Sequence, residues 1–205
     1  MAGIANALAR AVFYGYDATF GYAKAFKGLH QYAIDLSKRV AQKGGSSGSC
    51  TSIFGVRWDA FDGASLRFNN TALMEISDLT PNQPIPTVTN TTTNAQMNIF
   101  KWIISSYFAL VIPSAKSLGV ITQVSAAAAP TVDNMNALVD AIDAPTGEKA
   151  IYTSKLGRRM IATLKDAKYN ALGTDTNYNS MLLTWAGVPI YVDENISEVE
   201  TNVLD

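Results

Sequence analysis

The sequence predicts a folded α+β protein, and three observations lead to this prediction. Of the 205 residues, 48% are hydrophobic, which is ordinary for a globular chain and far above what a disordered chain carries. Strand-like alternation of apolar and polar residues is concentrated in the first half of the chain, whereas helical and strand-like patterns alternate in the second half. Only 16% of the residues are charged, well below the usual ~25%, so much of the surface is available to protein partners.

Helical patterns come first along the chain. Residues 4–12 place apolar side chains one helical turn apart, and the same spacing predicts a longer helix over residues 29–40 that stops at Gly44-Gly45. After a Gly/Ser loop, residues 51–58 place apolar side chains on one face at period two, which is typical of a strand. The predicted order therefore begins with two helices and one strand.

Short strands and a long connection complete the first half. Strands are expected over residues 64–68, 72–76 and 99–113. Residues 77–98 contain three prolines and a Thr/Asn tract. Because proline has no backbone N–H to donate to a sheet, this stretch is predicted to be a connection without strands.

The second half alternates helix and strand after an alanine run that ends at Pro130. Thr131 and Ser154 are suited to cap two helices, because their hydroxyls accept hydrogen bonds from the free N–H groups of a first helical turn. The second of these helices carries an apolar stripe that includes Met160, and lysines and arginines occupy its outer side. Strands are expected over residues 150–153, 181–185 and 188–192.

The two ends of the chain carry opposite charge, although the net charge is only −1. Residues 1–58 hold seven basic and two acidic side chains, whereas residues 193–205 hold five acidic side chains and no basic one. Fields of opposite sign attract, so this asymmetry favours head-to-tail contacts between subunits, or a basic face turned toward a polyanion. Solvated chain ends are the alternative.

Few residues of the chain are candidates for catalysis or ligand binding. The loop at 43–49 sets a lysine beside glycines, as phosphate sites do, but it lacks the Gly-Lys-Ser/Thr ending of a phosphate-binding loop. Cys50 and His30 could pair as nucleophile and base, although a structural thiol and an ordinary surface histidine are favoured. One cysteine and one histidine exclude an internal disulfide, a multi-thiolate zinc site and a histidine-rich metal centre. We therefore predict no catalytic residue, no cofactor and no metal site.

Three charged or aromatic clusters are also better explained by structure than by chemistry. The acidic pairs Asp193-Glu194 and Asp140 with Asp143 are typical of solvated faces. Arg158-Arg159 invites a nucleic-acid interpretation, yet the near-neutral chain favours a solvated or subunit-contacting face. The aromatic residues of segment 13–26 could stack bases, but such density more often fills a core or a subunit joint.

Five short motifs follow one another along the chain. They are Phe13-Tyr14-Gly15-Tyr16-Asp17, Phe26-Lys27-Gly28-Leu29, Gly44-Gly45-Ser46 leading through Thr51-Ser52-Ile53 to Val56-Arg57-Trp58, Ala150-Ile151-Tyr152 with the basic helix after it, and Gly187-Val188-Pro189-Ile190 followed by Asp193 and Glu194. In this order they resemble motifs of tailed-bacteriophage major capsid proteins, a family with the Hong Kong 97-like fold. The resemblance spans nearly the whole chain.

The resemblance implies a particular architecture. Residues 1–122 would form the peripheral-type lobe with the segments that lead into it. Residues 123–205 would form the axial-type lobe and the acidic C-terminal tail, which returns toward the peripheral lobe. Family members usually carry an N-terminal arm, an extended loop and a long spine helix upstream, and the chain is expected to lack most of these, with residues 1–12 as the last turns of the spine.

The resemblance also implies a function without chemistry. The chain would be a major capsid subunit that self-assembles as pentamers and hexamers into an icosahedral shell around double-stranded DNA. It would be synthesised in the cytoplasm of the bacterial host and reside in the virion capsid. Implied partners are copies of itself, portal, scaffolding or cement proteins, and packaged DNA contacted without sequence specificity.

Other functions stay open at this stage. A shell protein of the same fold could enclose a protein cargo, and a small nucleotide-binding or thiol enzyme or a monomeric adaptor would belong to different classes. No membrane partner is expected, because the longest strongly apolar run, residues 103–112, is well short of the ~20 residues that a membrane-spanning helix needs.

Overall fold

The computed structural model describes residues 2–15, 25–45, 48–68, 75–78, 87–89, 96–98, 102–105, 108–114, 116–164, 172–175 and 180–200. Its contacts divide the chain into two units. The first comprises Met1–Leu66 and Leu110–Asp205, and the second comprises Arg67–Ala109. The peripheral and axial lobes, expected to meet between residues 122 and 123, stay a prediction.

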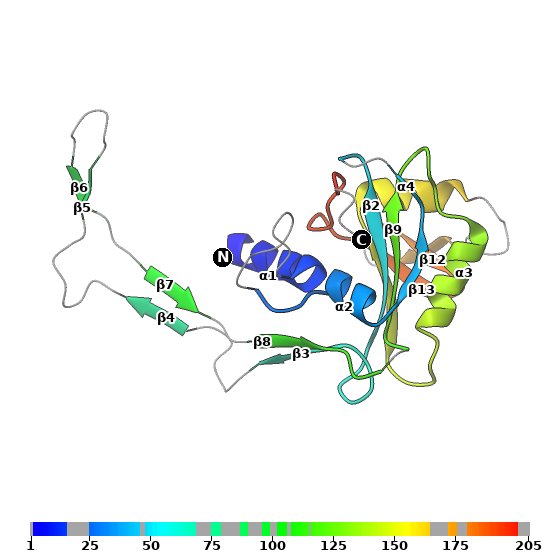
Figure 1. Ribbon diagram of the computed structural model, residues 1–205, viewed down its shortest axis with the longest axis horizontal. Coiled ribbons are helices and arrows are strands. Elements are labelled where there is room, and N and C mark those ends of the chain that lie inside the picture. Colours follow the sequence, from blue (N-terminus) through cyan, green and yellow to red (C-terminus); the bar gives the residue numbers. More distant parts are fainter. Residues whose placement is uncertain are drawn as a thin grey trace. The chain divides into compact units, whose positions relative to one another are not determined.

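A seven-stranded mixed sheet forms the centre of the first unit (Figure 1). In spatial order its strands are β1 (Arg39–Gln42), β9 (Leu118–Val124), β2 (Thr51–Trp58), β10 (Glu148–Thr153), β13 (Val188–Val192), β12 (Ser180–Trp185) and β11 (Leu172–Asp175). β2 runs antiparallel to both of its neighbours, β9 and β10. The pairs β1 with β9 and β10 with β13 are parallel, whereas β12 is antiparallel to β11 and β13.

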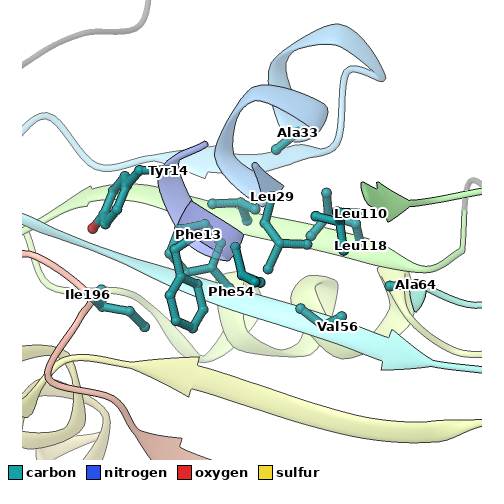
Figure 2. Packing of buried hydrophobic residues seen from close by; sticks show 12 residues of the cluster. Phe13, Tyr14, Leu29, Ala33, Phe54, Val56, Ala64, Leu110, Leu118 and Ile196 are labelled. Carbon is teal, nitrogen blue, oxygen red and sulfur yellow. The ribbon is translucent and has the colours of Figure 1, made fainter. Parts of the chain in front are cut away.

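Helices cover both faces of this sheet. The described residues form four of them: α1 (Ala2–Tyr14), α2 (Leu29–Asp35), α3 (Val132–Ala141) and α4 (Lys155–Thr163). Residues of α1 and α2 pack with Phe54 and Val56 of β2 in one buried cluster (Figure 2), and residues of α3 and α4 pack with Ile53 in another. Successive strand residues point to opposite faces, so β2 is buried on both sides. The predicted α+β class is confirmed.

The two predicted helix caps are confirmed. The Thr131 hydroxyl accepts a hydrogen bond from the Asn134 backbone N–H at 3.2 Å, at the start of α3. The Ser154 hydroxyl accepts one from the Gly157 N–H, also at 3.2 Å, at the start of α4. Each cap satisfies a donor that the helix itself leaves unpaired. The signal is local, which is why the sequence alone reveals it.

The predicted helix over residues 29–40 is wrong in its second half. The helix ends at Asp35, and Ser37 has a φ of 53°, in the left-handed region that a continuing helix cannot adopt. The chain then forms β1 and pairs with β9. Val40, which the helical spacing places in α2, packs instead on the face of the sheet covered by α3. The apolar spacing spans two separate elements.

The strand β9 lies in the interior of the sheet, and the sequence analysis does not identify it. All seven of its residues are buried between β1 and β2. Gly119 has a specific role there, because a Cβ at this position would lie 2.9 Å from the Ala141 Cβ and crowd α3. β1 and β11 are likewise absent from the predicted strands.

The second unit consists of two-stranded antiparallel ladders. β4 (Glu75–Asp78) pairs with β7 (Trp102–Ser105), and β5 (Thr87–Thr89) pairs with β6 (Gln96–Asn98). The prediction of a connection without strands over residues 77–98 is therefore wrong, since the β-branched run Thr87–Thr89 favours a strand beyond the last proline. β3 (Ser65–Phe68) and β8 (Phe108–Val111), whose residues fall partly in each unit, form a separate two-stranded sheet. β3, β7 and β8 confirm strands predicted there. The strand expected at 72–76 overlaps β4, and residues 69–74 lie outside the described part.

Candidate functional site

The Gly/Ser loop does not present a free lysine to a phosphate. The Lys43 ammonium donates a hydrogen bond to Oδ1 of Asn134 at 3.1 Å, and this amide oxygen also accepts a bond from the Thr131 N–H. Lys43 thereby ties the loop to the first turn of α3. Residues 46–47 of the loop lie outside the described residues.

Cys50 and His30 are both buried, as residues with a structural role are. The Cys50 thiol is fully buried and donates to the backbone carbonyl of Glu200 at 3.1 Å. Burial, and then the Glu200 carboxylate, raise the pKa of this thiol, which disfavours the thiolate that a nucleophile needs. His30 is only 8% exposed and its ring packs beside those of Tyr14 and Phe54. The expectation of a surface histidine is wrong, because the first turn of α2 faces the sheet.

The acidic pairs form ordinary surface contacts. The Lys155 ammonium donates to Glu194 at 2.6 Å, which lowers the pKa of Glu194, and Lys149 does the same for Asp143. Asp193 accepts bonds from the backbone and side chain of Asn195 in a tight turn. Within the described part of the chain, no three His, Cys, Asp or Glu side chains are grouped as a metal would require.

The aromatic residues of segment 13–26 that the structure describes serve packing, as the sequence favours. Phe13 and Tyr14 are buried in the cluster of α1, α2 and β2, and Phe26 packs against it. Tyr16, Phe20 and Tyr22 lie outside the described residues. Among the helices that are described, none combines the length and the apolar character that crossing a membrane requires.

A buried carboxylate holds the C-terminal segment against the start of β2. Glu200 is 5% exposed, and its two carboxylate oxygens accept hydrogen bonds from the Tyr14 hydroxyl at 2.6 Å and the Ser52 hydroxyl at 2.7 Å. Its backbone forms a bridge with Cys50, and the Ser197 N–H donates to the Tyr14 hydroxyl at 2.8 Å. The segment from Ser197 to Glu200 thus lies against α1 and the start of β2.

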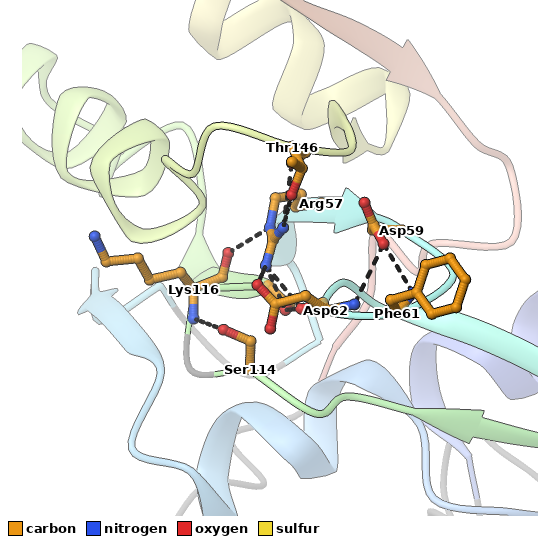
Figure 3. A network of polar contacts seen from close by, with 8 residues as sticks. Arg57, Asp59, Phe61, Asp62, Ser114, Lys116 and Thr146 are labelled. Carbon is orange, nitrogen blue, oxygen red and sulfur yellow. Dashed lines mark hydrogen bonds and ion pairs between the residues drawn. The ribbon is translucent and has the colours of Figure 1, made fainter.

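A buried guanidinium organises the opposite end of β2 (Figure 3). Arg57 is 0% exposed and donates to three backbone carbonyls, those of Lys116 at 3.1 Å, Thr146 at 3.2 Å and Asp62 at 2.7 Å. These carbonyls come from three different loops. The same guanidinium also contacts Asp62 a second time, through the exposed Asp62 carboxylate at 3.2 Å. Arg57 therefore fixes the loop that follows β2 relative to the rest of the sheet.

Large hydrophobic and basic side chains are also exposed on the described part of the chain. Large hydrophobic side chains reach the surface at five described positions: Ile34, Leu36, Phe61, Tyr191 and Val199. Phe61 is the extreme case, with 90% of its surface exposed. The outer side of α4 carries Lys155, Arg158 and Arg159, all exposed, as the sequence predicted; Lys165 and Lys168 lie outside the described residues.

Sequence reasoning missed the three residues that stand out in this arrangement. Arg57 interrupts an apolar strand, and a charge at such a position is a signal of a buried polar network. Phe61 stands between Asp59 and Asp62 in a short loop, which marks an apolar side chain with no local partner. Nothing in the sequence separates Glu200 from the other acids of the tail.

Comparison with known proteins gives one similarity of interest. No protein-family model matches the chain, and no curated protein matches it. Among solved structures, the chain is similar to a chain of the near-atomic structure of bacteriophage Epsilon15, with a TM-score of 0.48 and 16% sequence identity. The match covers 99% of this chain and 64% of that chain, so this chain spans less than two thirds of its length. A similarity of this size assigns no role to any residue of this chain.

Proposed function

We propose that the chain is the major capsid subunit of a tailed bacteriophage, which assembles through pentamers and hexamers into an icosahedral shell around double-stranded DNA. The observation that carries the proposal is the convergence of the family-like motifs, which are far apart in the sequence and packed against one another in the structure. The resemblance therefore concerns a connected part of the fold rather than scattered short matches.

The first two motifs meet at their glycines. A Cβ on Gly15 would lie 2.2 Å from the Gly28 backbone nitrogen, and a Cβ on Gly28 would lie 2.4 Å from the Gly15 nitrogen. No side chain fits at either position, because the end of α1 and the start of α2 are in backbone contact. Phe13 and Leu29, from the same two motifs, enter the cluster that packs on β2. The residues of the first two motifs therefore pack directly against one another.

The later motifs meet in the central sheet. A Cβ on Gly45 would lie 2.6 Å from the Gln123 carbonyl oxygen, so this glycine permits the loop to pass close to β9. The strand of the third motif, β2, pairs with β10, which carries the fourth. β10 in turn pairs with β13, which carries the fifth, with Ile151 opposite Ile190.

The proposed partners follow from the same reasoning. Copies of the chain are the principal partner, and portal, scaffolding or cement proteins would complete the particle. Packaged DNA would be contacted by basic side chains without sequence specificity, an electrostatic contact that weakens with added salt. The mature location would be the virion capsid. Exposed apolar side chains and a helix with a basic outer side support a role in assembly over a role in catalysis.

The test is the assembly state of the purified chain. We expect light scattering coupled to chromatography to show species far above 22.0 kDa, and negative-stain microscopy to show rings, sheets or closed shells. A chain that stays at 22.0 kDa across the concentration range would contradict the proposal. Particles that enclose a protein cargo and no nucleic acid, shown by absorbance ratio and mass spectrometry, would favour the cargo-compartment alternative instead.

A further inference from the structure

Phe61 is held out into solvent by a rigid loop. The Asp59 carboxylate accepts hydrogen bonds from the backbone N–H groups of Phe61 at 2.8 Å and Asp62 at 3.2 Å, and Arg57 donates to the Asp62 carbonyl from below. Gly63 permits the tight fold, since a Cβ there would lie 2.4 Å from the Asp59 nitrogen. Figure 3 shows the Phe61 ring pointing away from the Arg57 side chain. Because these bonds hold the loop backbone, little ordering of the loop is needed when a partner buries the ring.

The loop is acidic around this ring. Asp59 and Asp62 flank Phe61, and the Asp62 side chain is mostly exposed. Hydrogen bonds from the two backbone N–H groups lower the pKa of Asp59, so its carboxylate stays charged at neutral pH. A partner surface for this loop must therefore receive one aromatic ring and accommodate the Asp59 carboxylate and the Asp62 carboxylate, which already contacts Arg57.

The outer side of α4 has the complementary character. Lys155, Arg158, Arg159 and Ala162 line an open surface hollow of about 430 Å³, and the Lys155 ammonium at its edge is paired with Glu194. Among the residues that the structure describes, no carboxylate forms an ion pair with Arg158 or Arg159. Their aliphatic stems provide apolar walls and their guanidinium groups can lie over an aromatic face.

These two surfaces lie at opposite ends of β2 (Figure 1). Gly157 of α4 is beside Thr51, the first residue of β2, whereas the Phe61 loop follows Trp58, the last. At about 3.3 Å per residue, the eight-residue strand holds them roughly 23 Å apart. The loop therefore does not reach the hollow of its own chain, and the occupant must come from another molecule.

We propose that Phe61 of one copy of the chain inserts into the α4 hollow of the next copy, where Arg158 and Arg159 receive the ring and the flanking carboxylates. The proposal rests on the proposed function and deepens it by naming a contact. Because a protruding loop meets a different surface on its partner, the contact is head-to-tail, and repetition generates a ring when the rotation closes. The opposite charges of the two surfaces, both present on one chain, favour a second copy as the occupant.

Disulfide trapping between two different variants tests the contact directly. Ala60→Cys places a thiol next to Phe61, and Ala162→Cys places one in the hollow; both positions are exposed, and the native Cys50 is buried. We expect mild oxidation of the mixed variants to give at least about ten times more cross-linked dimer than either variant alone. Adding Phe61→Ser to the Ala60→Cys chain should remove the excess. Equal cross-linking in all samples would overturn the proposal.

Light scattering separates this proposal from the proposed function. If the wild-type chain assembles, Phe61→Ser and Arg158→Glu should shift it toward 22.0 kDa, while Phe61→Trp should retain assembly because tryptophan binds a guanidinium best. Ala137→Ser, at an exposed position of α3 outside both surfaces, is the matched control and should assemble normally. Assembly of Phe61→Ser at the wild-type level overturns only this contact, and so does an equal loss in Ala137→Ser. A wild-type chain that never assembles overturns both proposals.

Discussion

The two ends of β2 hold opposite charges in the protein interior by different means. At the loop end, the Arg57 guanidinium is fully buried; three carbonyl oxygens from three loops accept its hydrogen bonds, and the Asp62 carboxylate lies 3.2 Å from it. At the other end, the Glu200 carboxylate is almost fully buried, and hydroxyl groups of Tyr14 and Ser52 donate to it. One centre fixes loops to the sheet, and the other fixes the C-terminal segment.

The difference between the centres lies in how their partners can adjust. A carbonyl oxygen only accepts hydrogen bonds, so the loop end depends on a donor with the geometry of a guanidinium. A hydroxyl both donates and accepts, so the tail end can adapt to a neutral side chain at position 200. We therefore expect substitution of Arg57 at the loop end to lower the free energy of unfolding more than substitution of Glu200 at the tail end.

Arg57→Met should have the largest effect. The substitution preserves much of the apolar stem but removes the guanidinium donor from the Lys116, Thr146 and Asp62 carbonyls, of which that of Asp62 keeps a second donor, the Ser117 hydroxyl. We expect the free energy of unfolding to fall by about 3 kcal/mol. Urea denaturation measures it, with the exposed Arg159→Met as the matched control, for which the loss should stay below about 0.5 kcal/mol. Equal losses in the two variants would show that the buried network contributes nothing.

Glu200→Gln should cost less, about 1 to 2 kcal/mol, because the Ser52 hydroxyl can rotate and accept from the new amide. The same denaturation experiment compares it with Glu200→Ala, which removes the acceptor of both the Tyr14 and the Ser52 hydroxyl and should cost more. If Glu200→Gln proved as damaging as Arg57→Met, the negative charge itself, rather than the hydrogen bonds, would be what the tail end requires.

Tyr14→Phe should cost about 1 kcal/mol at neutral pH and should also change the response to alkali. Burial, and then the Glu200 carboxylate, raise the pKa of Tyr14 well above its ordinary value, so the folded chain keeps this proton after the unfolded chain has released it. The wild-type chain should therefore lose stability as the pH rises above ~10, by up to about 1.4 kcal/mol per pH unit from this group.

Denaturation curves at several alkaline pH values should show a shallower loss for Tyr14→Phe than for the wild type. Tyr152→Phe is the comparison, because burial also raises the pKa of Tyr152, although that side chain is only partly buried. An identical alkaline slope in Tyr14→Phe and the wild type would mean that the Tyr14 proton is not held by the fold.

Phe61→Ser should have the smallest effect on stability, within about 0.5 kcal/mol, because the ring is exposed and the loop is held by the backbone and by Arg57. Thermal or urea unfolding at low protein concentration measures it. A substantial loss would mean that the ring supports the fold of its own chain, which would also undermine its assignment to a contact between copies.

The sequence reveals features that depend on nearby residues and misses those that depend on distant ones. The caps Thr131 and Ser154 and the alternation of β2 depend on residues a few positions apart, so the residues themselves carry the signal. The burial of His30 depends on which side of α2 meets the sheet, and the early end of that helix depends on the pairing of β1 with β9. Such long-range pairing leaves little trace in the local pattern.

By itself, the sequence determined the α+β class, the capped helices, most strands of the second half and the order of motifs that resembles phage capsid proteins. The tertiary structure decided the rest: that β9 lies inside the sheet, that Arg57 and Glu200 are buried at opposite ends of β2, and that Phe61 is left in solvent. The physical reason is that propensity and capping act within a few residues, whereas burial is set by partners that the chain brings together from more than a hundred residues away, as with Tyr14 and Glu200.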